Sequence, residues 1–438
     1  MKRKIMSMLL VIMLLMQVVL IAGCGAAKPQ NEAVESATGE TEGGFKMTYE
    51  LACQMNYENF GENVAYLNNS NRANDKYVEE GFIHMLDPNE RAEGEKINFY
   101  GISHWMEITK SDGMTYKMYG VLWVPLDFDP AWVNNETVTE QYPTLVMCAG
   151  FCDGAMYWSG ARAAYMNTLA PEGYIGYSFD FVGGSKNGVE SYSNGVRSYC
   201  TTGDTNGETY FTQMSVMTEV EELHLMVDAI KELKYVDSEQ IVLIGASQGS
   251  LVSGIVAAQR EKEGKNDVAG LILTCPALCI PNYAYECVNT LTIEGAETIE
   301  EKVAAFSESP ESYIEYMTFL GNQPGVPYYL DIINNVPYDE DLGYYSILPL
   351  MSGYTGSVLL IHGLADTAVL PYYSYDAVYG DKAVYSANVA ELLLVTNAGH
   401  TFEESSSTPE YMKTQAYETA LTYLTSNGIV PQNEQSTD

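Results

Sequence analysis

A chain of 438 residues, 46% of them hydrophobic, can bury a large core, and one large domain with an insertion fits this length better than three small domains. Its 58 acidic and 22 basic side chains give a formal net charge of −36 at pH 7. So much negative charge argues against nucleic acid as a partner and against highly anionic polymers as substrates. It also argues against docking on anionic lipid, except through an anchor.

The chain begins with the pattern of an export signal. Basic residues occupy positions 2–4, an apolar run extends over residues 5–20, and the small pair Ala22-Gly23 stands directly before Cys24. A basic start, a short hydrophobic core and small residues before the cut predict a secretory signal peptide over residues 1–23.

A cysteine directly after Ala-Gly resembles a bacterial lipobox. The resemblance implies that Cys24 carries lipid and becomes the first mature residue, which would hold the protein on a bacterial membrane, facing outside the cytoplasm. An ordinary signal peptide or an uncleaved anchor is the alternative. Residues 24–45 are small, polar and acidic, and we predict a flexible tether there. Because no later stretch offers about 18 uninterrupted apolar residues, no second membrane span is expected.

The next segments predict the opening of a sheet. Residues 46–93 have weak periodicity, and no role can be assigned to them. Alternating patterns over Lys96–Tyr100 and Met114–Val124, broken near Ser111-Asp-Gly113, predict an antiparallel pair of strands.

Strand and helix patterns then alternate. Apolar runs predict strands over Thr144–Cys148 and Tyr174–Phe181, and a helix over Met156–Leu169 lies between them. Apolar residues at helical spacing from Met214 to Ile230 predict a further helix, and Val268–Thr274 reads as another strand.

The most informative stretch is a G-x-S-x-G motif between a strand and a helix. The apolar residues 241–244 precede Gly245-Ala-Ser247-Gln-Gly249, and a helical pattern runs from Leu251 to Arg260. This context is typical of a nucleophile elbow, a sharp turn that exposes the serine hydroxyl at the top of a sheet. The motif needs small residues, because bulky side chains two positions either side of Ser247 would collide with neighbouring elements.

An acid and a histidine follow in a meaningful order. Val358–Ile361 and Leu392–Val395 read as buried strands, with Asp366 just past the first and His400 just past the second. The chain has five histidines, and only His400 lies on a loop after a strand and after both Ser247 and Asp366. His362 directly follows its strand and is expected to shape the turn that presents Asp366. The order Ser, Asp, His is that of an α/β-hydrolase.

Residues 142–278 and 355–425 resemble the α/β-hydrolases. The Leu360-Ile-His-Gly363 segment with Asp366, together with Ala398-Gly-His400, is similar to the esterase and serine-peptidase branches. The likeness is greatest to cinnamoyl and feruloyl esterase-like enzymes and to serine aminopeptidase-like hydrolases, which share Phe179-Asp180-Phe181 and the Gly-Ser-Asn loop after it. The chain departs from them at Ala149-Gly150-Phe151, where many relatives have His-Gly.

The resemblance implies an α/β fold with a mostly parallel central sheet flanked by helices and a lid insertion after the sixth strand. It places the first part of the core at 46–278, the lid at 279–352 and the second part of the core at 353–438. Acidic helix-like stretches (298–306 and 310–320) and aromatic loops (Tyr328-Tyr329 and Tyr344-Tyr345) fall in the lid. Its tyrosines could stack on an aromatic acyl group, although a chain with 34 tyrosines must place some there in any case.

The resemblance also implies roles for single residues. Ser247 would be the nucleophile, His400 its general base and Asp366 the group that orients the imidazole. The backbone N–H groups of Phe151 and Gln248 would form an oxyanion hole. This chemistry calls for no cofactor, and we predict no metal site, because Cys148-x3-Cys152 and Cys275-x3-Cys279 lack nearby histidines.

Three functions stay open. The first is a surface-anchored serine esterase, and the second is a serine peptidase of the aminopeptidase or prolyl-peptidase type, with lid acids clamping the substrate's amino terminus. The third is a non-catalytic binding lipoprotein, against which the intact serine, acid and histidine argue. The expected partner is a small ester or a short peptide; oligomeric state and disulfide pattern are not readable. The candidate clamp residues are Glu300, Glu301, Glu308 and Glu311.

Overall fold

The structure is a computed structural model. It describes residues 40–41, 44–45, 83–84, 99–133, 138, 140–151, 155, 164–182, 214–281, 295–298, 301, 326–340, 344–396, 398–400 and 410–431. The predicted signal segment, Cys24 and almost all of the predicted tether lie outside these residues, as does most of 46–93. Within the described part, no helix combines the length and the apolar composition that a bilayer crossing requires.

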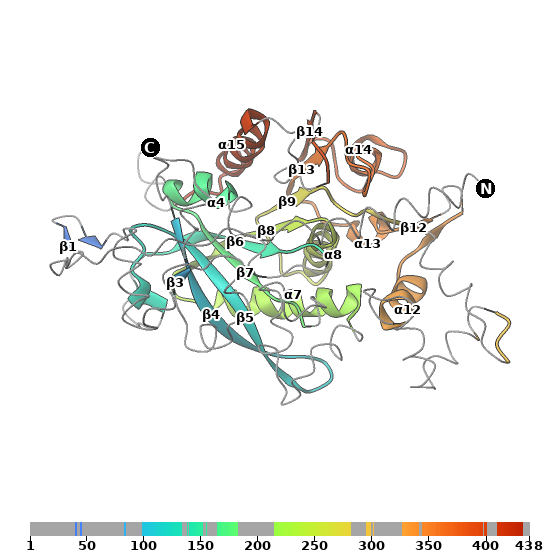
Figure 1. The fold of residues 1–438 in the computed structure, drawn as a ribbon, viewed down its shortest axis with the longest axis horizontal. Helices are drawn as coiled ribbons and strands as arrows, with labels where there is room; N and C mark the ends of the chain where they lie inside the picture. Colours follow the sequence, from blue (N-terminus) through green and yellow to red (C-terminus); the bar gives the residue numbers. More distant parts are fainter. Residues whose placement is uncertain are drawn as a thin grey trace, which may run out of the picture. The chain divides into compact units, whose positions relative to one another are not determined.

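A nine-stranded sheet forms the centre of the fold, in the order β14-β13-β9-β8-β6-β7-β5-β4-β3 (Figure 1). The six strands from β14 to β7 run parallel, whereas β5, β4 and β3 are joined to them by antiparallel pairing. This confirms the predicted mostly parallel sheet. The strands are β3 (Ile83–His84), β4 (Phe99–Thr109), β5 (Thr115–Pro125), β6 (Tyr142–Cys148), β7 (Ile175–Phe179), β8 (Val236–Ala246), β9 (Gly270–Thr274), β13 (Ser357–Gly363) and β14 (Ala390–Val395). A separate antiparallel pair joins β1 (Glu40–Thr41) to β2 (Gly44–Phe45).

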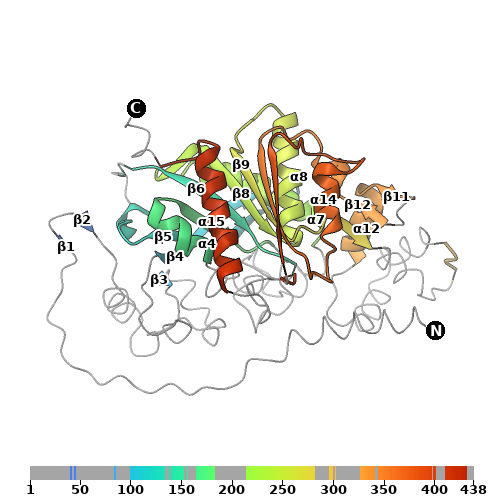
Figure 2. The ribbon, with the colours of Figure 1, turned by 90° about the horizontal axis from the view of Figure 1, so that it is seen from above.

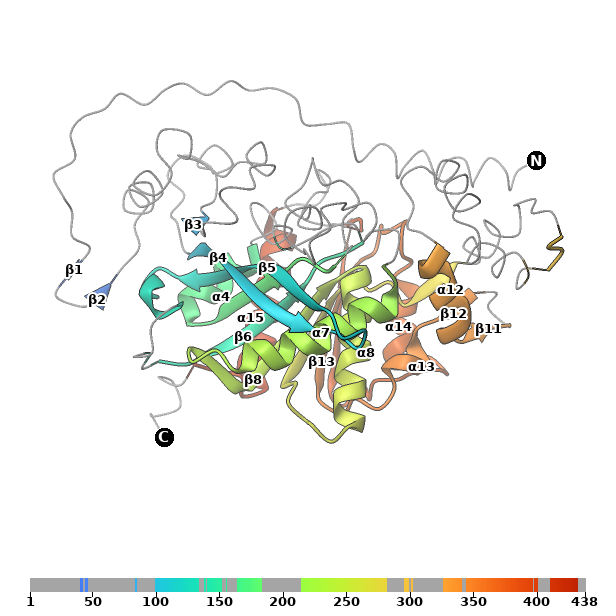
Figure 3. The ribbon, with the colours of Figure 1, turned by 90° about the horizontal axis from the view of Figure 1, so that it is seen from below.

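Helices cover both faces of the sheet. Seen from above, α4 (Ala164–Leu169) and α15 (Glu410–Ser426) lie in front of the strands (Figure 2). Seen from below, α7 (Val216–Lys231) and α8 (Gln248–Lys262) lie in front of them (Figure 3). The smaller α14 (Tyr372–Tyr379) adds to the layer of α7 and α8.

Alternation along the central strands produces the two cores. In β8, Ile241 and Leu243 pack with α7 and α8, while Val242 and Ile244 pack with α4 and α15. Because side chains alternate across a strand, a strand covered on both faces must be apolar at every position, as residues 241–244 are.

The structure corrects two predicted boundaries. The opening strand was expected at residues 96–100 but spans Phe99–Thr109, because β5 pairs with it over its whole length. The helix after the G-x-S-x-G motif was expected from Leu251 and begins at Gln248, directly after the turn. Helix α7 matches its prediction closely, since Ser215 and Thr218 form a capping box that fixes its start. Only the last turns of the predicted helix 156–169 are described, as α4.

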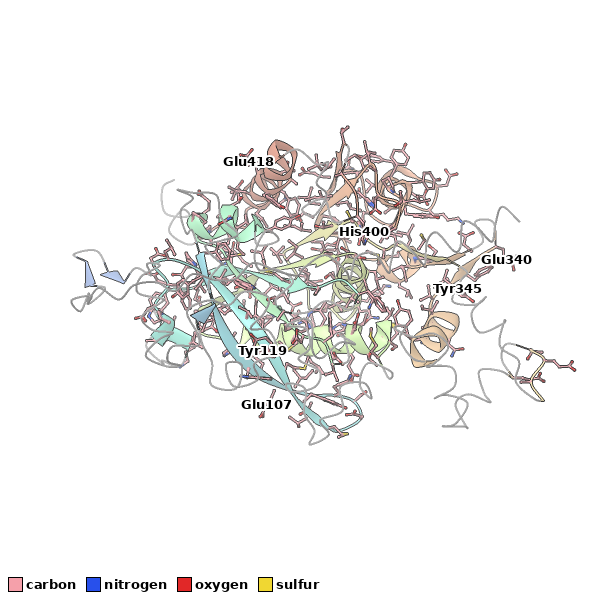
Figure 4. The ribbon with its side chains drawn as sticks, viewed as in Figure 1. Glu107, Tyr119, Glu340, Tyr345, His400 and Glu418 are labelled. Carbon is pink, nitrogen blue, oxygen red and sulfur yellow. The ribbon has the colours of Figure 1, made fainter. Side chains whose placement is uncertain are left out.

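An insertion separates β9 from β13, after the sixth long strand counted from β4. Its described parts are a small antiparallel sheet in the order β10-β12-β11 and the helices α12 (Val326–Asn335) and α13 (Leu348–Met351). The tyrosines predicted in loops lie instead in regular structure: Tyr328 is on α12, and Tyr345 (labelled in Figure 4) is buried on β12. Most of both acidic stretches lies outside the described residues. The small strands are β10 (Cys279–Pro281), β11 (Tyr338–Asp339) and β12 (Tyr344–Ser346).

Candidate active site

Ser247 is the single residue between a strand and a helix, and its backbone conformation is strained. It follows β8 and precedes α8, with φ 52° and ψ −116°, and a positive φ is costly for a residue with a Cβ. Its N–H donates to the carbonyl of Thr274 at 2.9 Å, and its own carbonyl accepts from Ser250 (3.1 Å) and Ala277 (3.2 Å). These three backbone bonds hold the strained turn in place.

Two glycines allow the tight packing around this turn. A Cβ on Gly245 would lie 2.4 Å from backbone atoms of Gly249, and a Cβ on Gly249 would lie 2.3 Å from the carbonyl oxygen of Cys148. The predicted collisions on either side of Ser247 are thus confirmed. The same contact presses the start of α8 against the end of β6, where the loop carrying Phe151 begins.

We expect Gly249→Ala to disrupt this packing. Its methyl group would meet backbone atoms, which cannot rotate away, so the free energy of unfolding should fall by at least the roughly 1–3 kcal/mol typical of an overpacked core. Urea unfolding measures this loss. Gly399→Ala is the matched control: Gly399, like Gly249, has no positive φ, but the added Cβ meets no atom within 4 Å. Equal losses in both variants would show that the contact with Cys148 is not the cause.

The structure brings the predicted acid and histidine to the serine. The Oγ of Ser247 lies 2.9 Å from Nε2 of His400, and Nδ1 of His400 lies 2.7 Å from Oδ2 of Asp366. The three residues follow β8, β14 and β13 at the carboxyl edge of the sheet (Figure 4 labels His400). The Asp366 side chain is fully buried, whereas that of His400 is 20% exposed, so the chain of hydrogen bonds runs from the interior to the surface.

Asp366 is held ionised by several donors. Its Oδ1 accepts the N–H groups of Ala368 and Val369, both at 2.9 Å, and its Oδ2 also accepts from Nε2 of His362 at 3.1 Å. Burial alone would raise the pKa of this carboxyl, but the hydrogen bonds from His362, His400 and Val369 outweigh it and hold the pKa well below its usual range.

Hydrogen-bond partners define the histidine tautomers. Nδ1 of His400 faces a carboxylate, so it carries the proton and leaves Nε2 free to accept from the Ser247 hydroxyl. Nε2 of His362 faces two acceptors, Asp366 and the carbonyl of Val369, so it is the protonated nitrogen there. His362 therefore does what the sequence predicted: it supports the turn that presents the acid.

Backbone contacts join the loops that carry these side chains. A Cβ on Gly363 would lie 2.4 Å from the carbonyl oxygen of Ala398, and the Ala365 N–H donates to that same oxygen at 2.8 Å. The N–H of Cys275, after β9, donates to the carbonyl of Ile361 at 2.7 Å. The loops after β9, β13 and β14 are thereby fixed to one another.

The two predicted oxyanion-hole residues lie at the ends of neighbouring central strands. Phe151 follows β6, and Gln248 is the first residue of α8, directly after Ser247. The first N–H groups of a helix have no acceptor within the helix, which leaves that of Gln248 available to a ligand. Residues 152–154 lie outside the described part.

A polar chain beside the serine escaped the sequence analysis. The side-chain amide of Gln248 donates from Nε2 to Oε2 of Glu219, and its Oε1 accepts from the hydroxyl of Tyr328, both at 2.8 Å. Glu219 is 3% exposed. Burial, together with the nearby carboxylates of Glu222 and Asp331, raises its pKa to about 8, which favours the neutral form of the acid near pH 7. One signal was present: Glu219 lies within the apolar stripe of α7.

Metal-ligand atoms also meet at this site. Among the described residues, ligand atoms of Cys275, Asp366 and His400 lie within 4.8 Å of one another. Both ring nitrogens of His400 already form hydrogen bonds, to Ser247 and Asp366, so a metal there would break the chain of bonds. In the described part of the chain, Cys148, Cys275 and Cys279 form no disulfide, and Cys275 lies just after β9, with φ 43°.

Comparisons with known proteins show similarity at the level of the fold. No family model matches the sequence, and no curated protein matches it. Among solved structures, the chain is similar to DcsB in complex with its substrate analogue, with 16% identity, a TM-score of 0.48, and coverage of 74% of this chain and 99% of that one. The chain is also similar to Est1E from Butyrivibrio proteoclasticus, with 18% identity and a TM-score of 0.42, over 73% of this chain and 99% of that one. A third similar structure is a putative dipeptidyl aminopeptidase IV from Bacteroides ovatus, with 19% identity and a TM-score of 0.44, over 74% of this chain and 36% of that one.

The topology identifies the fold. The sheet opens with an antiparallel hairpin, β6 and β7 are exchanged in sheet order, and the parallel strands then follow in sequence. A strained serine sits between β8 and α8, and an acid and a histidine follow β13 and β14. The chain therefore has an α/β-hydrolase fold, with an insertion after its sixth strand.

Proposed function

We propose that the protein is a serine hydrolase that cleaves carboxylic esters through an acyl-enzyme. The observation that carries the proposal is the continuous hydrogen-bonded chain from Ser247 through His400 to Asp366, anchored on a strained turn. Backbone strain of this kind is typical of functional sites, where the surrounding structure maintains it.

The geometry supports a two-step reaction. Nε2 of His400 takes the proton of the Ser247 hydroxyl while Oγ attacks the ester carbonyl carbon. The ionised Asp366 stabilises the imidazolium that forms. As the tetrahedral intermediate collapses, the bond to the alcohol oxygen breaks, and the alcohol leaves with the proton from His400. Water, activated by the same nitrogen, then hydrolyses the acyl-enzyme.

The negative charge of the intermediate needs donors that are already in place. We propose the N–H groups of Phe151 and Gln248 for this role, because their residues end neighbouring strands and Gln248 directly follows the nucleophile. Donors fixed in advance stabilise charge that exists only in the transition state, and losing one costs about 10²–10³-fold in kcat.

The described surroundings of the serine favour an ester over a peptide with a free amino terminus. Clamping an ammonium group requires an accessible carboxylate beside the serine. The side chain of Asp366 is fully buried, and Glu219 is 3% exposed. Of the four lid acids considered for the clamp, Glu301 is described, and its carboxylate accepts the N–H groups of Glu297 and Thr298; the other three lie outside the described residues.

We also propose that the enzyme works outside the cytoplasm, held on a bacterial membrane by lipid on Cys24. The basic start, the apolar run and the small residues before this cysteine support the proposal. Mass spectrometry of the mature amino terminus tests it: a lipid-modified Cys24 is expected, and an unmodified residue there would contradict the anchor.

A matched substrate panel tests the proposed activity. Turnover of p-nitrophenyl acetate and methyl ferulate is compared with that of an aminoacyl p-nitroanilide, while a fluorophosphonate probe reports labelling at Ser247. We expect ester turnover and labelling, with a high ratio of ferulate to acetate if the tyrosines of the insertion receive an aromatic acyl group. Preferred anilide cleavage would establish the peptidase instead. If the folded protein turned over none of these substrates and was not labelled by the probe, a non-catalytic binding protein would be favoured.

A further inference from the structure

Helix α12 of the insertion docks on the core through two polar side chains. The hydroxyl of Tyr328 donates to Oε1 of Gln248 at 2.8 Å, and Oδ2 of Asp331 accepts the N–H of Met217, in the first turn of α7, also at 2.8 Å. Side chains three positions apart lie on one face of a helix. One face of α12 therefore reaches both the residue after the nucleophile and the start of α7.

The Gln248 side chain is fixed at both ends. Its Nε2 donates to Glu219 and its Oε1 accepts from Tyr328, and the residue is 4% exposed. With a neighbour on each side, the amide can neither flip nor rotate without losing a buried hydrogen bond. Because this side chain belongs to a proposed oxyanion donor, the two bonds also restrain the backbone N–H of Gln248.

Tyr328 also touches the other proposed donor residue. Its ring centroid lies 5.7 Å from that of Phe151, with the planes tilted by 59°, a favourable aromatic geometry. A single side chain from the insertion thus contacts both residues whose N–H groups would receive the oxyanion.

We propose that Tyr328 is a positioning residue that sets the oxyanion hole by fixing Gln248 through its hydroxyl and Phe151 through its ring. This inference rests on the proposed function and extends it, because the insertion then takes part in assembling the site and does more than cover it. The required precision is high: a misplacement of about 1 Å can cost about 10²-fold in rate.

The chemistry of Glu219 agrees with this role. An ionised carboxylate two contacts from the hole would repel the oxyanion. Burial first, and the carboxylates of Glu222 and Asp331 with it, raise the pKa of Glu219 to about 8, against the opposing effects of the Gln248 hydrogen bond and of Lys110. The neutral form that this shift favours can anchor Gln248 through the hydrogen bond without adding a negative charge.

Tyr328→Phe tests the proposal, because it removes the hydroxyl and keeps the ring. We expect kcat for the best ester of the panel to fall about tenfold with KM changed less than twofold, since the loss appears only when the oxyanion forms. A trifluoromethyl ketone, whose adduct with Ser247 carries the oxyanion, should bind more weakly by a similar factor. Tyr354→Phe is the matched control: it removes a buried hydroxyl that donates to Val268, before the amino end of β9.

A double-mutant cycle with Gln248→Ala identifies the route of the effect. If the hydroxyl acts through Gln248, Tyr328→Phe should have no further effect on kcat in the Gln248→Ala background. Additive losses would show that Tyr328 acts on the substrate directly, and would overturn the inference. So would an unchanged kcat in Tyr328→Phe, or a loss matched by Tyr354→Phe. A wild-type protein without turnover or Ser247 labelling would instead remove the proposed function, and the inference with it.

Discussion

Ser247→Ala is expected to lower kcat for ester hydrolysis by about 10⁴-fold or more, with little change in the free energy of unfolding. With the proposed nucleophile removed, no acyl-enzyme can form, and only binding and the proposed oxyanion donors remain to assist water. Alanine tolerates the positive φ of this position as serine does, and the backbone bonds that hold the turn do not involve the side chain. Initial rates with excess enzyme, together with urea unfolding, measure both quantities.

A matched control distinguishes the nucleophile from a nearby hydroxyl. Ser253→Ala removes a buried serine hydroxyl further along α8, and we expect it to keep its activity within a few-fold. Ester turnover by Ser247→Ala within tenfold of wild type would show that another group attacks the carbonyl carbon. Failure of the fluorophosphonate to label Ser247→Ala, with normal labelling of Ser253→Ala, would locate the reactive hydroxyl directly.

Asp366→Asn is expected to reduce kcat by about 10⁴-fold, with KM nearly unchanged. The amide has no charge to stabilise the imidazolium, and with its NH₂ group toward His400 it would reverse the tautomer that leaves Nε2 free. Because His362 contacts the same oxygen as His400, the Nε2 proton of His362 would then face this NH₂ group, another donor. Steady-state kinetics at saturating ester measures the loss, and the exposed Asp228→Asn serves as the control for loss of a carboxylate. Activity within tenfold of wild type would mean that another group orients His400.

Asp366→Asn should also change how the free energy of unfolding depends on pH. The pKa of Asp366 is lower in the folded protein than its unfolded value of about 3.9. The group therefore stabilises the fold above pH 4, and this contribution is lost as the pH falls through the folded pKa. We expect the unfolding free energy of the variant to decline less between pH 5 and pH 2 than that of wild type.

Local chemistry explains why the core of the site could be predicted. The turn at Ser247 depends on Gly245 and Gly249, and both can be read directly because a close approach of backbone needs glycine. Asp366 and His400 directly follow apolar strands, and parallel strands bring their carboxyl ends to one edge.

Features that depend on distant partners could not be predicted in this way. The length of β4 is set by pairing with β5, which a pattern over residues 96–100 does not contain. Glu219 and Tyr328 meet through Gln248 although they are far apart in the chain. The position of Glu219 within the apolar stripe of α7 indicates burial but does not name its partner, and Tyr328 was one tyrosine among 34.

The backbone bonds among the loops have a consequence for how such a protein can diverge. Ser247 is tied to Thr274, Cys275 to Ile361 and Ala365 to Ala398 entirely through N–H and carbonyl groups, which every residue except proline supplies in full. Described side chains near the site that take no part in these bonds can therefore be exchanged without moving the serine, the histidine or the acid. On the proposed function, selection can change which ester is accepted by substitutions at these positions, while the reaction itself is inherited unchanged.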